Sequence, residues 1–276
     1  MSTTGWEIKR YRSGAGPEEL EDRVVMELPL EINVNGLPMV ALMRLPGLDK
    51  ELAVGFCLTE KVLEDVSQIN LLKHCGQMEE KLQEEEEVEG DGLNKGNLVE
   101  IEVESPGGRD RFSSTFVVRT GCGGADLSAI EDFHEGVVTS EIRVKEQVIY
   151  GLGRELTSRQ DIFRGTGGTH GAGIFTEEGG VEVVAEDVGR HNALDKAVGW
   201  CALREIPLED KILVLSGRIS YEMALKAIRV GIPIVVSLAA PTSLGLRIAE
   251  KAGLTVIGFS DGKRFNVYTH PRRIQP

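Results

Sequence analysis

Six side chains that could bind charged ligands or transfer protons fall within ten residues of this sequence. They follow the apolar run Val181–Ala185 and are Asp187, Arg190, His191, Asn192, Asp195 and Lys196. The β-branched run predicts a strand, and Asn192 with Asp195 three residues later has the spacing of a helix N-cap. Open α/β sheets bind anions where a strand ends at a helix N-terminus. The same residues also suit a helix cap and surface ion pairs, so the segment alone leaves both interpretations open.

Cys122 differs from the other cysteines because three glycines flank it in Arg119-Thr-Gly-Cys-Gly-Gly-Ala-Asp126. Glycine leaves the thiol unshielded and permits backbone conformations that other residues avoid. The capping-box spacing of Ser128 and Glu131 predicts a helix N-terminus just after the loop, and the helix dipole there would favour a thiolate. We therefore expect a reactive cysteine, and the alternative is a tight turn that happens to contain one.

The other three cysteines have structural explanations. Cys201 falls on the apolar face of the helix predicted after Asn192, and Cys57 lies in a helix-like segment where a small buried thiol is ordinary. Cys75 follows His74, but two adjacent ligands without further partners rarely bind a metal. Because the four cysteines show neither C-x-x-C nor zinc-ligand spacing, we expect no metal site and no disulfide framework.

Further polar segments follow three strands in the second half of the chain. Strands over 211–215, 232–237 and 254–259 alternate with helices over 220–230 and 242–252, a β-α-β-α-β order that predicts parallel strands ending at one edge of a sheet. The segments that follow these strands are Ser216-Gly-Arg218, Ala239-Ala-Pro-Thr242 and Phe259-Ser-Asp-Gly-Lys-Arg264. Their cations suit phosphates, and their glycines let the backbone approach a ligand. The alternative is that glycine, serine and aspartate are present only because turns favour them.

The sequence divides into two predicted domains, 1–118 and 119–276. The first is smaller and β-rich, with a hairpin signal at Asn35-Gly36 between strand-like runs and an acidic insertion near 77–92. The second alternates strands with helices, among them a helix predicted over 156–164 that stops at Gly165. The predicted fold class is α/β, a mixed sheet flanked by helices.

Composition narrows the possible partners. The 276 residues carry a net charge of −13, which argues against binding nucleic acid or an anionic membrane. The N-terminus lacks the apolar core of a signal peptide, and no apolar run is long enough to span a bilayer. We therefore expect a cytoplasmic protein.

Several of these segments together resemble the formate dehydrogenase accessory sulfurtransferase family, FdhD. The resemblance extends from about Glu51 to the C-terminus, and the segments that carry it are Gly168–His170, Glu186–Lys196, Leu215–Met223, Ala240–Ser243 and Arg264–His270. It implies a homodimer whose larger domain has a cytidine-deaminase-like α/β fold. Deaminase chemistry is not implied, because the sequence lacks the H-x-E and P-C-x-x-C motifs that hold zinc and its water.

The resemblance also implies a reaction and a binding site. Sulfur would pass from a cysteine desulfurase to the molybdenum cofactor, bis-molybdopterin guanine dinucleotide, before its insertion into the formate dehydrogenase apoenzyme. Cys122 would carry the sulfur as a persulfide. The family's cofactor-binding segment matches Phe259, Ser260, Asp261, Gly262, Lys263 and Arg264. The positions of Arg190, His191 and Arg218 at the ends of predicted strands add these three residues to the same pocket.

One position departs from the family pattern. The reactive loop of the family holds two cysteines, and Ala125 stands where the second is expected. A cycle that uses one cysteine remains possible, whereas a relay between two cysteines of the loop does not. A cofactor chaperone that handles no sulfur is therefore the second hypothesis. A nucleotide-dependent hydrolase is a distant third, because metal and P-loop motifs are missing.

Overall fold

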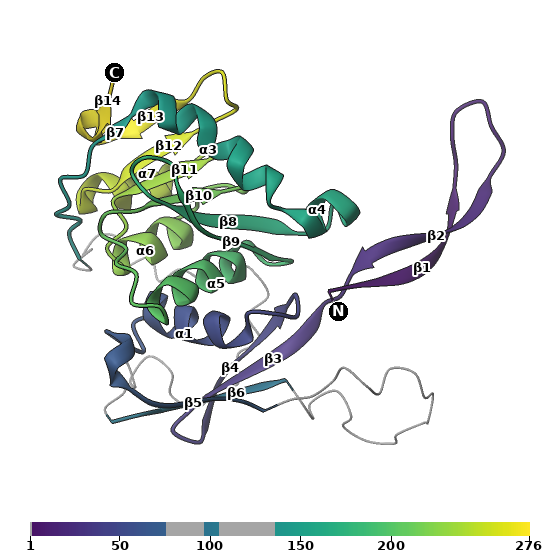
Figure 1. Ribbon diagram of the computed structural model, residues 1–276, viewed down its shortest axis with the longest axis horizontal. Helices are drawn as coiled ribbons and strands as arrows, with labels where there is room; N and C mark the ends of the chain where they lie inside the picture. Colours follow the sequence, from purple (N-terminus) through teal and green to yellow (C-terminus); the bar gives the residue numbers. More distant parts are fainter. Residues whose placement is uncertain (1, 76–96, 105–135) are drawn as a thin grey trace.

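The computed structural model describes residues 2–75, 97–104 and 136–276. Its largest sheet has six strands in the order β13-β12-β11-β10-β8-β9 (Figure 1). Three neighbours in this sheet, β10 (Ile212–Leu215), β11 (Ile234–Ser237) and β12 (Thr255–Gly258), run parallel. They alternate along the chain with helices α6 (Tyr221–Arg229) and α7 (Ser243–Ala252). The predicted β-α-β-α-β unit is therefore confirmed.

The remaining strands of this sheet make it mixed. Strand β8 (His170–Phe175) is antiparallel to β10 and to β9 (Val181–Asp187), and β13 (Asn266–Thr269) is antiparallel to β12. As a result, β8 begins at the edge of the sheet where β9 to β12 end. We call this edge the strand-tip edge.

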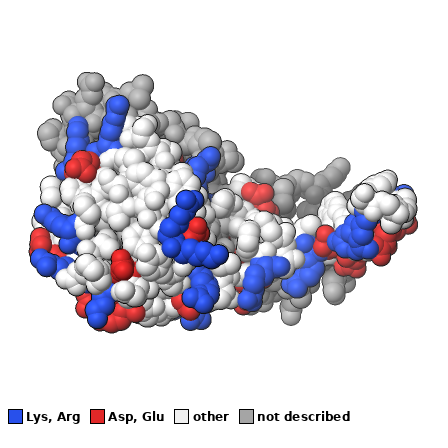
Figure 2. Space-filling model, turned by 90° about the horizontal axis from the view of Figure 1, so that it is seen from above, with Lys and Arg blue, Asp and Glu red and all other residues white. Residues whose placement is uncertain are grey.

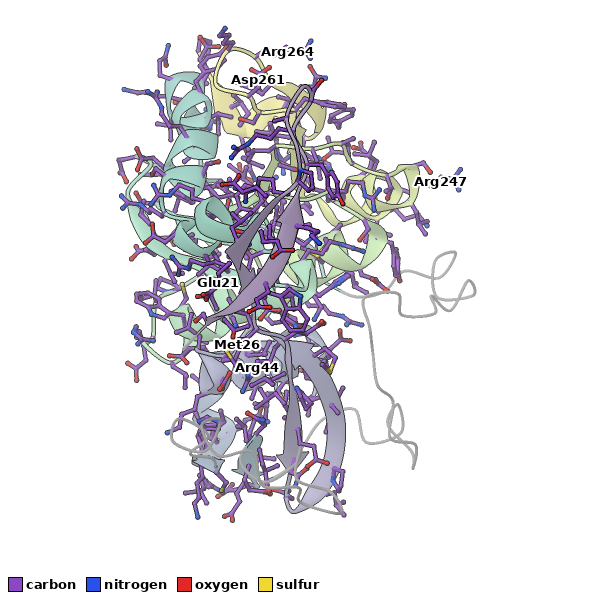
Figure 3. The ribbon with its side chains drawn as sticks, turned by 90° about the vertical axis from the view of Figure 1, so that its right-hand side faces the viewer. Glu21, Met26, Arg44, Arg247, Asp261 and Arg264 are labelled. Atoms are coloured by element: carbon purple, nitrogen blue, oxygen red, sulfur yellow. The ribbon has the colours of Figure 1, made fainter. Side chains whose placement is uncertain are left out.

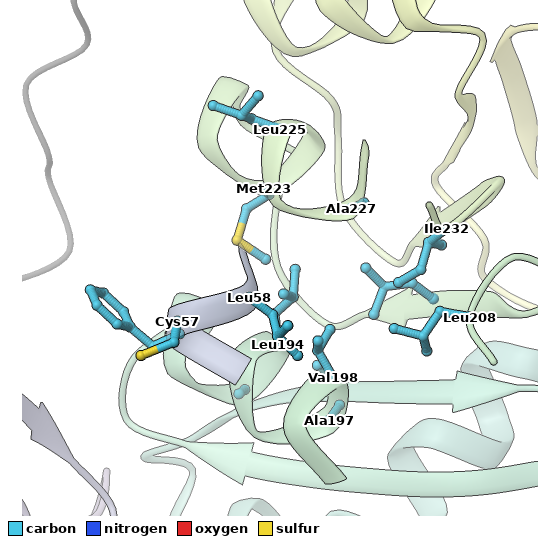
Figure 4. Close-up of a cluster of buried hydrophobic side chains, with 14 of the residues drawn as sticks. Cys57, Leu58, Leu194, Ala197, Val198, Leu208, Met223, Leu225, Ala227 and Ile232 are labelled. Carbon is cyan, nitrogen blue, oxygen red and sulfur yellow. The ribbon is translucent and has the colours of Figure 1, made fainter. Parts of the chain in front are cut away.

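Helices cover both faces of the sheet. On one face α5 (Arg190–Ala202) and α6 pack in a large apolar core that also includes α1 (Asp49–Thr59), as Figure 4 shows for Cys57, Leu194 and Met223. On the other face α3 (Glu146–Ser158) covers a second core. The apolar face predicted for the helix with Cys201 is confirmed, because this thiol is fully buried.

The N-terminal half forms a separate four-stranded sheet in the order β4-β3-β6-β5. Its strands are β3 (Leu28–Val34), β4 (Leu37–Arg44), β5 (Ile69–Cys75) and β6 (Leu98–Val103). The hairpin predicted at Asn35-Gly36 is confirmed: β3 and β4 are antiparallel, and both turn residues have the positive φ that a two-residue hairpin loop requires.

Before this sheet, β1 (Thr3–Arg10) and β2 (Glu18–Val25) form a two-stranded hairpin that projects away from the rest of the molecule (Figure 1). We call this hairpin the arm. It is an element that the sequence patterns did not predict.

The helix predicted over 156–164 is wrong in its bounds. The chain forms two helices here, α3 and α4 (Asp161–Thr166), and the second ends at Gly167 rather than Gly165. The carboxylate of Glu186, on β9, accepts hydrogen bonds from the backbone N–H groups of Ile162 and Phe163 and so caps α4. A cap supplied by a distant strand leaves no signal in the local sequence.

The remaining elements are short: η1 (Val66–Gln68), β7 (Val144–Lys145), η3 (Pro271–Arg273) and β14 (Ile274–Gln275). The mixed α/β class is confirmed. The cytidine-deaminase-like topology stays a prediction, as does the domain boundary between 118 and 119, which lies outside the described residues. Among the described helices, none is both long and apolar enough to cross a bilayer.

Candidate functional site

The strand-tip edge collects the polar segments predicted to follow the strands. Asp187 ends β9, Ser216 follows β10, Ala239 lies just beyond β11, and Phe259 directly follows β12. Two serines fasten neighbouring tips to one another: Ser216 Oγ accepts a hydrogen bond from Gly171 N, and Ser237 Oγ donates one to Gly217 O. The edge is therefore an ordered surface.

The helix after β9 starts three residues earlier than predicted. Its N-cap is Gly189 and its first residue is Arg190, so the prediction of Asn192 as N-cap is wrong. Asp187 organises this turn instead, because its Oδ1 accepts hydrogen bonds from Gly189 N and from Asn192 Nδ2. Asn192 Nδ2 also donates to Met43 O, 2.8 Å away in the N-terminal sheet.

Asp187 and Lys196 form a fully buried ion pair, with 2.7 Å between Oδ2 and Nζ. Both side chains also contact the backbone of Leu45: Asp187 accepts from its N–H, and Lys196 donates to its carbonyl oxygen. Burial lowers the pKa of Lys196, an effect that the carboxylate of Asp187 opposes. This pair therefore joins β9 and α5 to the N-terminal half.

Asp195 belongs to a second buried ion pair. Lys226 Nζ on α6 lies 2.9 Å from Asp195 Oδ2, and it also donates to Thr59 Oγ1 on α1 and pairs with Glu60. Burial disfavours the charge of Lys226, but Asp195 and Glu60 outweigh it and raise the pKa of the amine. Four of the six polar residues that follow β9 thus serve packing between helices and sheets: Asp187, Asn192, Asp195 and Lys196.

Arg190 and His191 remain at the strand-tip edge. Gly217 lies beside Arg190 and His170: a methyl group at this glycine would stand 3.5 Å from His170 Nδ1 and 3.8 Å from Arg190 Cδ. Arg218 is the next residue and is exposed. The first residue of β8 and the segments after β9 and β10 thus meet in one cluster of basic side chains, which we call the tip cluster: His170, Arg190, His191 and Arg218.

Electrostatics indicate that the tip cluster has an excess of positive charge, although Glu222 pairs with His191. Burial lowers the pKa of His170, and Arg190, His191 and Arg218 lower it further, whereas Asp187 has a smaller opposing effect. Among the described residues, no carboxylate forms an ion pair with Arg190 or Arg218, and Arg190 Nε is buried without a hydrogen-bond partner. An anion such as a phosphate would relieve both the repulsion and the unsatisfied donor.

His191 is less available than its position in the sequence suggests. Its Nε2 lies 2.9 Å from Glu222 Oε2 on α6, and the imidazole is 16% exposed. Hydrogen bonding from His191 lowers the pKa of Glu222. His191 and Glu222 therefore join the start of α5 to α6, next to Arg190.

The segment Phe259–Arg264 forms a tight turn after β12. Phe259 has a φ of 54° and a partly exposed ring, whereas Ser260 is buried and donates to Ile149 O. Asp261 Oδ1 accepts from the N–H groups of Lys263 and Arg264, and these bonds lower the pKa of its carboxyl group. The loop that carries Asp261 and Arg264 is labelled in Figure 3.

Not every predicted residue of this segment can contact a ligand. The carboxylate of Asp261 shapes the turn, and the hydroxyl of Ser260 points into the protein. Gly262 has a φ of 85°, which suits glycine alone. Phe259, Lys263 and Arg264 present exposed side chains and remain candidates for binding. In the sheet order, β11 separates this turn from the tip cluster.

His170 is a residue of the cluster that the sequence pattern did not predict. It lies at the start of β8, and a search restricted to the ends of parallel strands overlooks it. Its signal is a histidine between the glycine-rich segment 165–168 and an apolar strand.

The predicted reactive residue, Cys122, lies outside the described residues. Two of the other thiols are poor nucleophiles, because burial raises the pKa of Cys57 and of Cys201 to about 12. Cys75 is partly exposed. The described part of the chain contains no group of three or more side chains suited to hold a metal ion.

Comparisons with known proteins agree on one family. The sequence model of the FdhD/NarQ family matches residues 25–275. The chain is 39% identical over 261 residues to the sulfur carrier protein FdhD of Sulfolobus acidocaldarius, covering 92% of each chain. It is 37% identical over 276 residues to the protein of that name in Streptomyces coelicolor, covering 97% of this chain and 94% of the relative.

A solved structure has the same fold. The crystal structure of a candidate formate dehydrogenase accessory protein from Desulfotalea psychrophila superposes with a TM-score of 0.77 at 24% identity, and the match covers 100% of both chains. At this level of identity the likeness establishes the fold.

Proposed function

Because the chain belongs to the FdhD/NarQ family, we propose that it is a sulfur carrier required for formate dehydrogenase activity. Relatives that are 34 to 39% identical over most of the chain carry the name sulfur carrier protein FdhD. In this proposal, sulfur moves from a cysteine desulfurase to the molybdenum cofactor, which then enters the formate dehydrogenase apoenzyme. The reaction would take place in the cytoplasm.

Cys122 carries the sulfur in this scheme. Its thiolate attacks the outer sulfur of the desulfurase persulfide, a new S–S bond forms, and the desulfurase cysteine leaves as a thiolate. In the second transfer the S–S bond of the Cys122 persulfide would break, the outer sulfur would take an electron pair from the acceptor, a cofactor with its molybdenum in the reduced state, and Cys122 would leave as a thiolate. The two thiols with a pKa of about 12 favour this assignment, since neither Cys57 nor Cys201 is ionised near neutral pH.

The observation that carries the proposed binding site is the charge of Arg190 and Arg218, which form no ion pair among the described residues. The bis-molybdopterin guanine dinucleotide substrate is anionic, and its phosphates suit the guanidinium groups of Arg190 and Arg218. Phe259, Lys263 and Arg264 would contact another part of this large ligand from the end of β12. From residue 136 onward basic residues slightly outnumber acidic ones, although the whole chain has a net charge of −13.

Mass spectrometry tests the sulfur carrier directly. After incubation with a cysteine desulfurase and cysteine, we expect one added sulfur atom on the intact chain. Cys122→Ser should abolish this addition, and Cys75→Ser, which removes the partly exposed thiol, should leave it unchanged. Sulfur retained by the Cys122→Ser variant would overturn the assignment.

Calorimetry tests the binding segment after β12. Lys263→Ala combined with Arg264→Ala should weaken binding of a guanine nucleotide, because two exposed cations next to Phe259 are removed. An unchanged affinity would exclude this segment from the site.

Ala125 favours a second candidate function. A chaperone that binds the cofactor and delivers it to the apoenzyme would need neither the second cysteine nor Cys122. The two candidates differ in one measurement, in which Cys122→Ser is supplied with the cofactor already bound. A chaperone would still activate formate dehydrogenase, whereas a sulfur carrier would not.

A further inference from the structure

The carboxylate of Glu186 receives three hydrogen bonds from the segment that leads into His170. Its Oε1 accepts from Ile162 N at 2.9 Å, and its Oε2 accepts from Phe163 N at 2.8 Å and from Thr169 Oγ1 at 2.6 Å. The first two donors belong to the first turn of α4, and Thr169 directly precedes His170. One side chain on β9 thus holds both ends of the chain between α4 and β8.

The chain between these two ends depends on that carboxylate for its position. It contains three glycines within residues 165–168, and Gly167 has a φ of 70°, a conformation that glycine adopts without strain. His170 is the first residue of β8, so strand pairing supports it from one side only. Thr169 is 5% exposed, and its hydrogen bond to Glu186 is therefore shielded from water and costly to lose.

The arm also contacts this segment, but it does not orient a polar group there. Helix α4 packs against β2, and a methyl group at Gly168 would stand 2.9 Å from Val25 Cγ2. This contact is apolar, because charged residues of the arm pair with one another. Lys9 pairs with Glu19, and Figure 2 shows acidic and basic side chains next to each other along the arm. Packing on Gly168 limits the movement of the segment, whereas the carboxylate of Glu186 fixes the direction of Thr169.

The position of His170 determines how strongly neighbouring charges act on its ring. Burial lowers the pKa of His170, and charged groups shift it as well. The charged groups with the largest effect are Arg190 and His191 on α5, Arg218 after β10 and Asp187 on β9. The first three lower the pKa and the carboxylate raises it. Because Glu186 is not among these groups, a change at Glu186 should act on His170 mainly through its position.

We propose that Glu186 is a positioning residue of the tip cluster, which acts through Thr169 to hold His170 beside Arg190 and Arg218. A carboxylate suits this task because it accepts hydrogen bonds, and all three of its neighbours donate. With the imidazole already in place, an anion can bind without first ordering the segment 165–168. The role of Glu186 in binding rests on the proposed function, whereas its effect on His170 can be measured in the free protein.

Nuclear magnetic resonance of the His170 ring tests the proposal in the free protein. Glu186→Gln keeps the size of the side chain but replaces one acceptor oxygen with a donor, so at least one of the three hydrogen bonds is lost. Release of His170 from Arg190 and Arg218 should raise its titration midpoint toward 6.5, whereas the loss of a negative charge alone would lower it. The direction of the shift therefore separates the two explanations.

Two further variants complete this titration. Thr169→Val removes the hydroxyl next to His170 but keeps the charge of Glu186 and the cap of α4, and it should also raise the midpoint. Glu182→Gln removes a negative charge four residues earlier on β9 and should leave the midpoint unchanged or slightly lower. If Glu186→Gln does not fold, Thr169→Val decides alone. A midpoint that stays the same or falls in both variants of the Glu186–Thr169 pair would overturn the proposal.

Calorimetry with guanosine diphosphate measures what this position contributes to binding. Glu186→Gln should weaken the affinity roughly fivefold, the equivalent of about one hydrogen bond, and Glu182→Gln should bind as wild type does. In a chain that already carries His170→Ala, the change at Glu186 should have almost no further effect, because Glu186 acts through His170. Equal losses with and without His170 would overturn the proposal.

A wild-type chain that binds no guanosine diphosphate would overturn the proposed anion site and, with it, the role of Glu186 in binding. The titration of His170 would still decide whether Glu186 positions that ring, so the two failures can be told apart.

Discussion

Helix α5 carries charged residues of two kinds: those that are buried and paired with an opposite charge, and those that are not. Asp195 and Lys196, on its second turn, are buried and paired with Lys226 and Asp187. Arg190, on its first turn, is only half-buried and has no carboxylate partner among the described residues. A charged residue on its own therefore does not indicate a binding site. A charge that is paired inside the protein stabilises the fold, whereas a charge without a partner is a candidate for binding a ligand of opposite charge.

The largest effect should come from breaking the buried group. Asp195→Ala leaves the ammonium of Lys226 buried with Glu60 as its nearest carboxylate, and we expect a decrease of about 3–5 kcal/mol in the free energy of unfolding. Urea denaturation measures this decrease. The double variant Asp195→Leu with Lys226→Met should recover most of it, because no charge remains unpaired. A decrease below about 1 kcal/mol would show that the pair is exposed to water.

Removing the arginines of the tip cluster should leave stability almost unchanged and weaken ligand binding instead. Arg190→Ala with Arg218→Ala removes two repelling cations, so we expect stability to stay within about 0.5 kcal/mol of wild type. Affinity for a guanine nucleotide should fall roughly ten- to a hundredfold for each charge-assisted hydrogen bond removed, as measured by calorimetry. Arg247→Ala, which removes an exposed cation on α7, is the matched control and should bind normally (Figure 3).

If the arginine variants bind as tightly as wild type but unfold more easily, the distinction between the two groups of residues fails. Arg190 would then be a structural residue like Asp195, and the anion site would have to lie at the turn after β12.

The sequence predicted the strand-tip edge, but it did not predict which charged residues of α5 are paired inside the protein. Strand ends follow from local patterns, so Ser216–Arg218 and Phe259–Arg264 were found where parallel strands stop. Whether a charge is paired depends on residues that are distant in sequence, such as Leu45 for Lys196 and Thr59 for Asp195. No local pattern reports these contacts, and for this reason the polar residues of α5 looked alike.

Contacts between residues that are distant in sequence also explain the other differences between the predicted and the observed structure. The cap that Glu186 supplies to α4 crosses from another strand, and the position of His170 follows from the antiparallel pairing of β8. The arm escaped prediction because Trp6 and Ile8 alternate with polar residues for only a few positions, and a single hairpin with charged rims resembles a surface loop.

The tip cluster should respond to pH through His170. Burial and three neighbouring cations lower the pKa of His170 below 6.5, so the unfolded chain takes up this proton at a higher pH than the folded chain does. His170 therefore has no effect on stability well above pH 6.5, and it lowers the stability of the folded chain as the pH falls below that value. A bound phosphate should raise the pKa of His170, because it favours the imidazolium.

Nuclear magnetic resonance can follow the His170 ring with and without a guanine nucleotide. A titration midpoint that moves upward on binding would place the phosphate beside the tip cluster. A midpoint that does not move would place it elsewhere, and His170→Asn identifies the signal.

The smallest effect should come from Glu222→Gln, which tests whether His191 belongs with the paired or the unpaired residues. Glu222 is partly exposed, so its removal should cost less than about 1 kcal/mol of stability at neutral pH. Hydrogen bonding from His191 lowers the pKa of Glu222, and its contribution is present above the ordinary value of 4.5 and disappears as the pH falls through the lowered pKa. The variant should therefore become as stable as wild type in acid.

Nucleotide binding decides what the His191–Glu222 contact does. If it only joins two helices, Glu222→Gln should bind a guanine nucleotide as wild type does. If it holds Arg190 in the tip cluster, affinity should fall a few-fold, and adding Arg190→Ala to Glu222→Gln should then cost less than Arg190→Ala alone costs. Full additivity of the two changes would separate His191 from the site and leave Arg190, Arg218 and His170 as the residues that meet the anion.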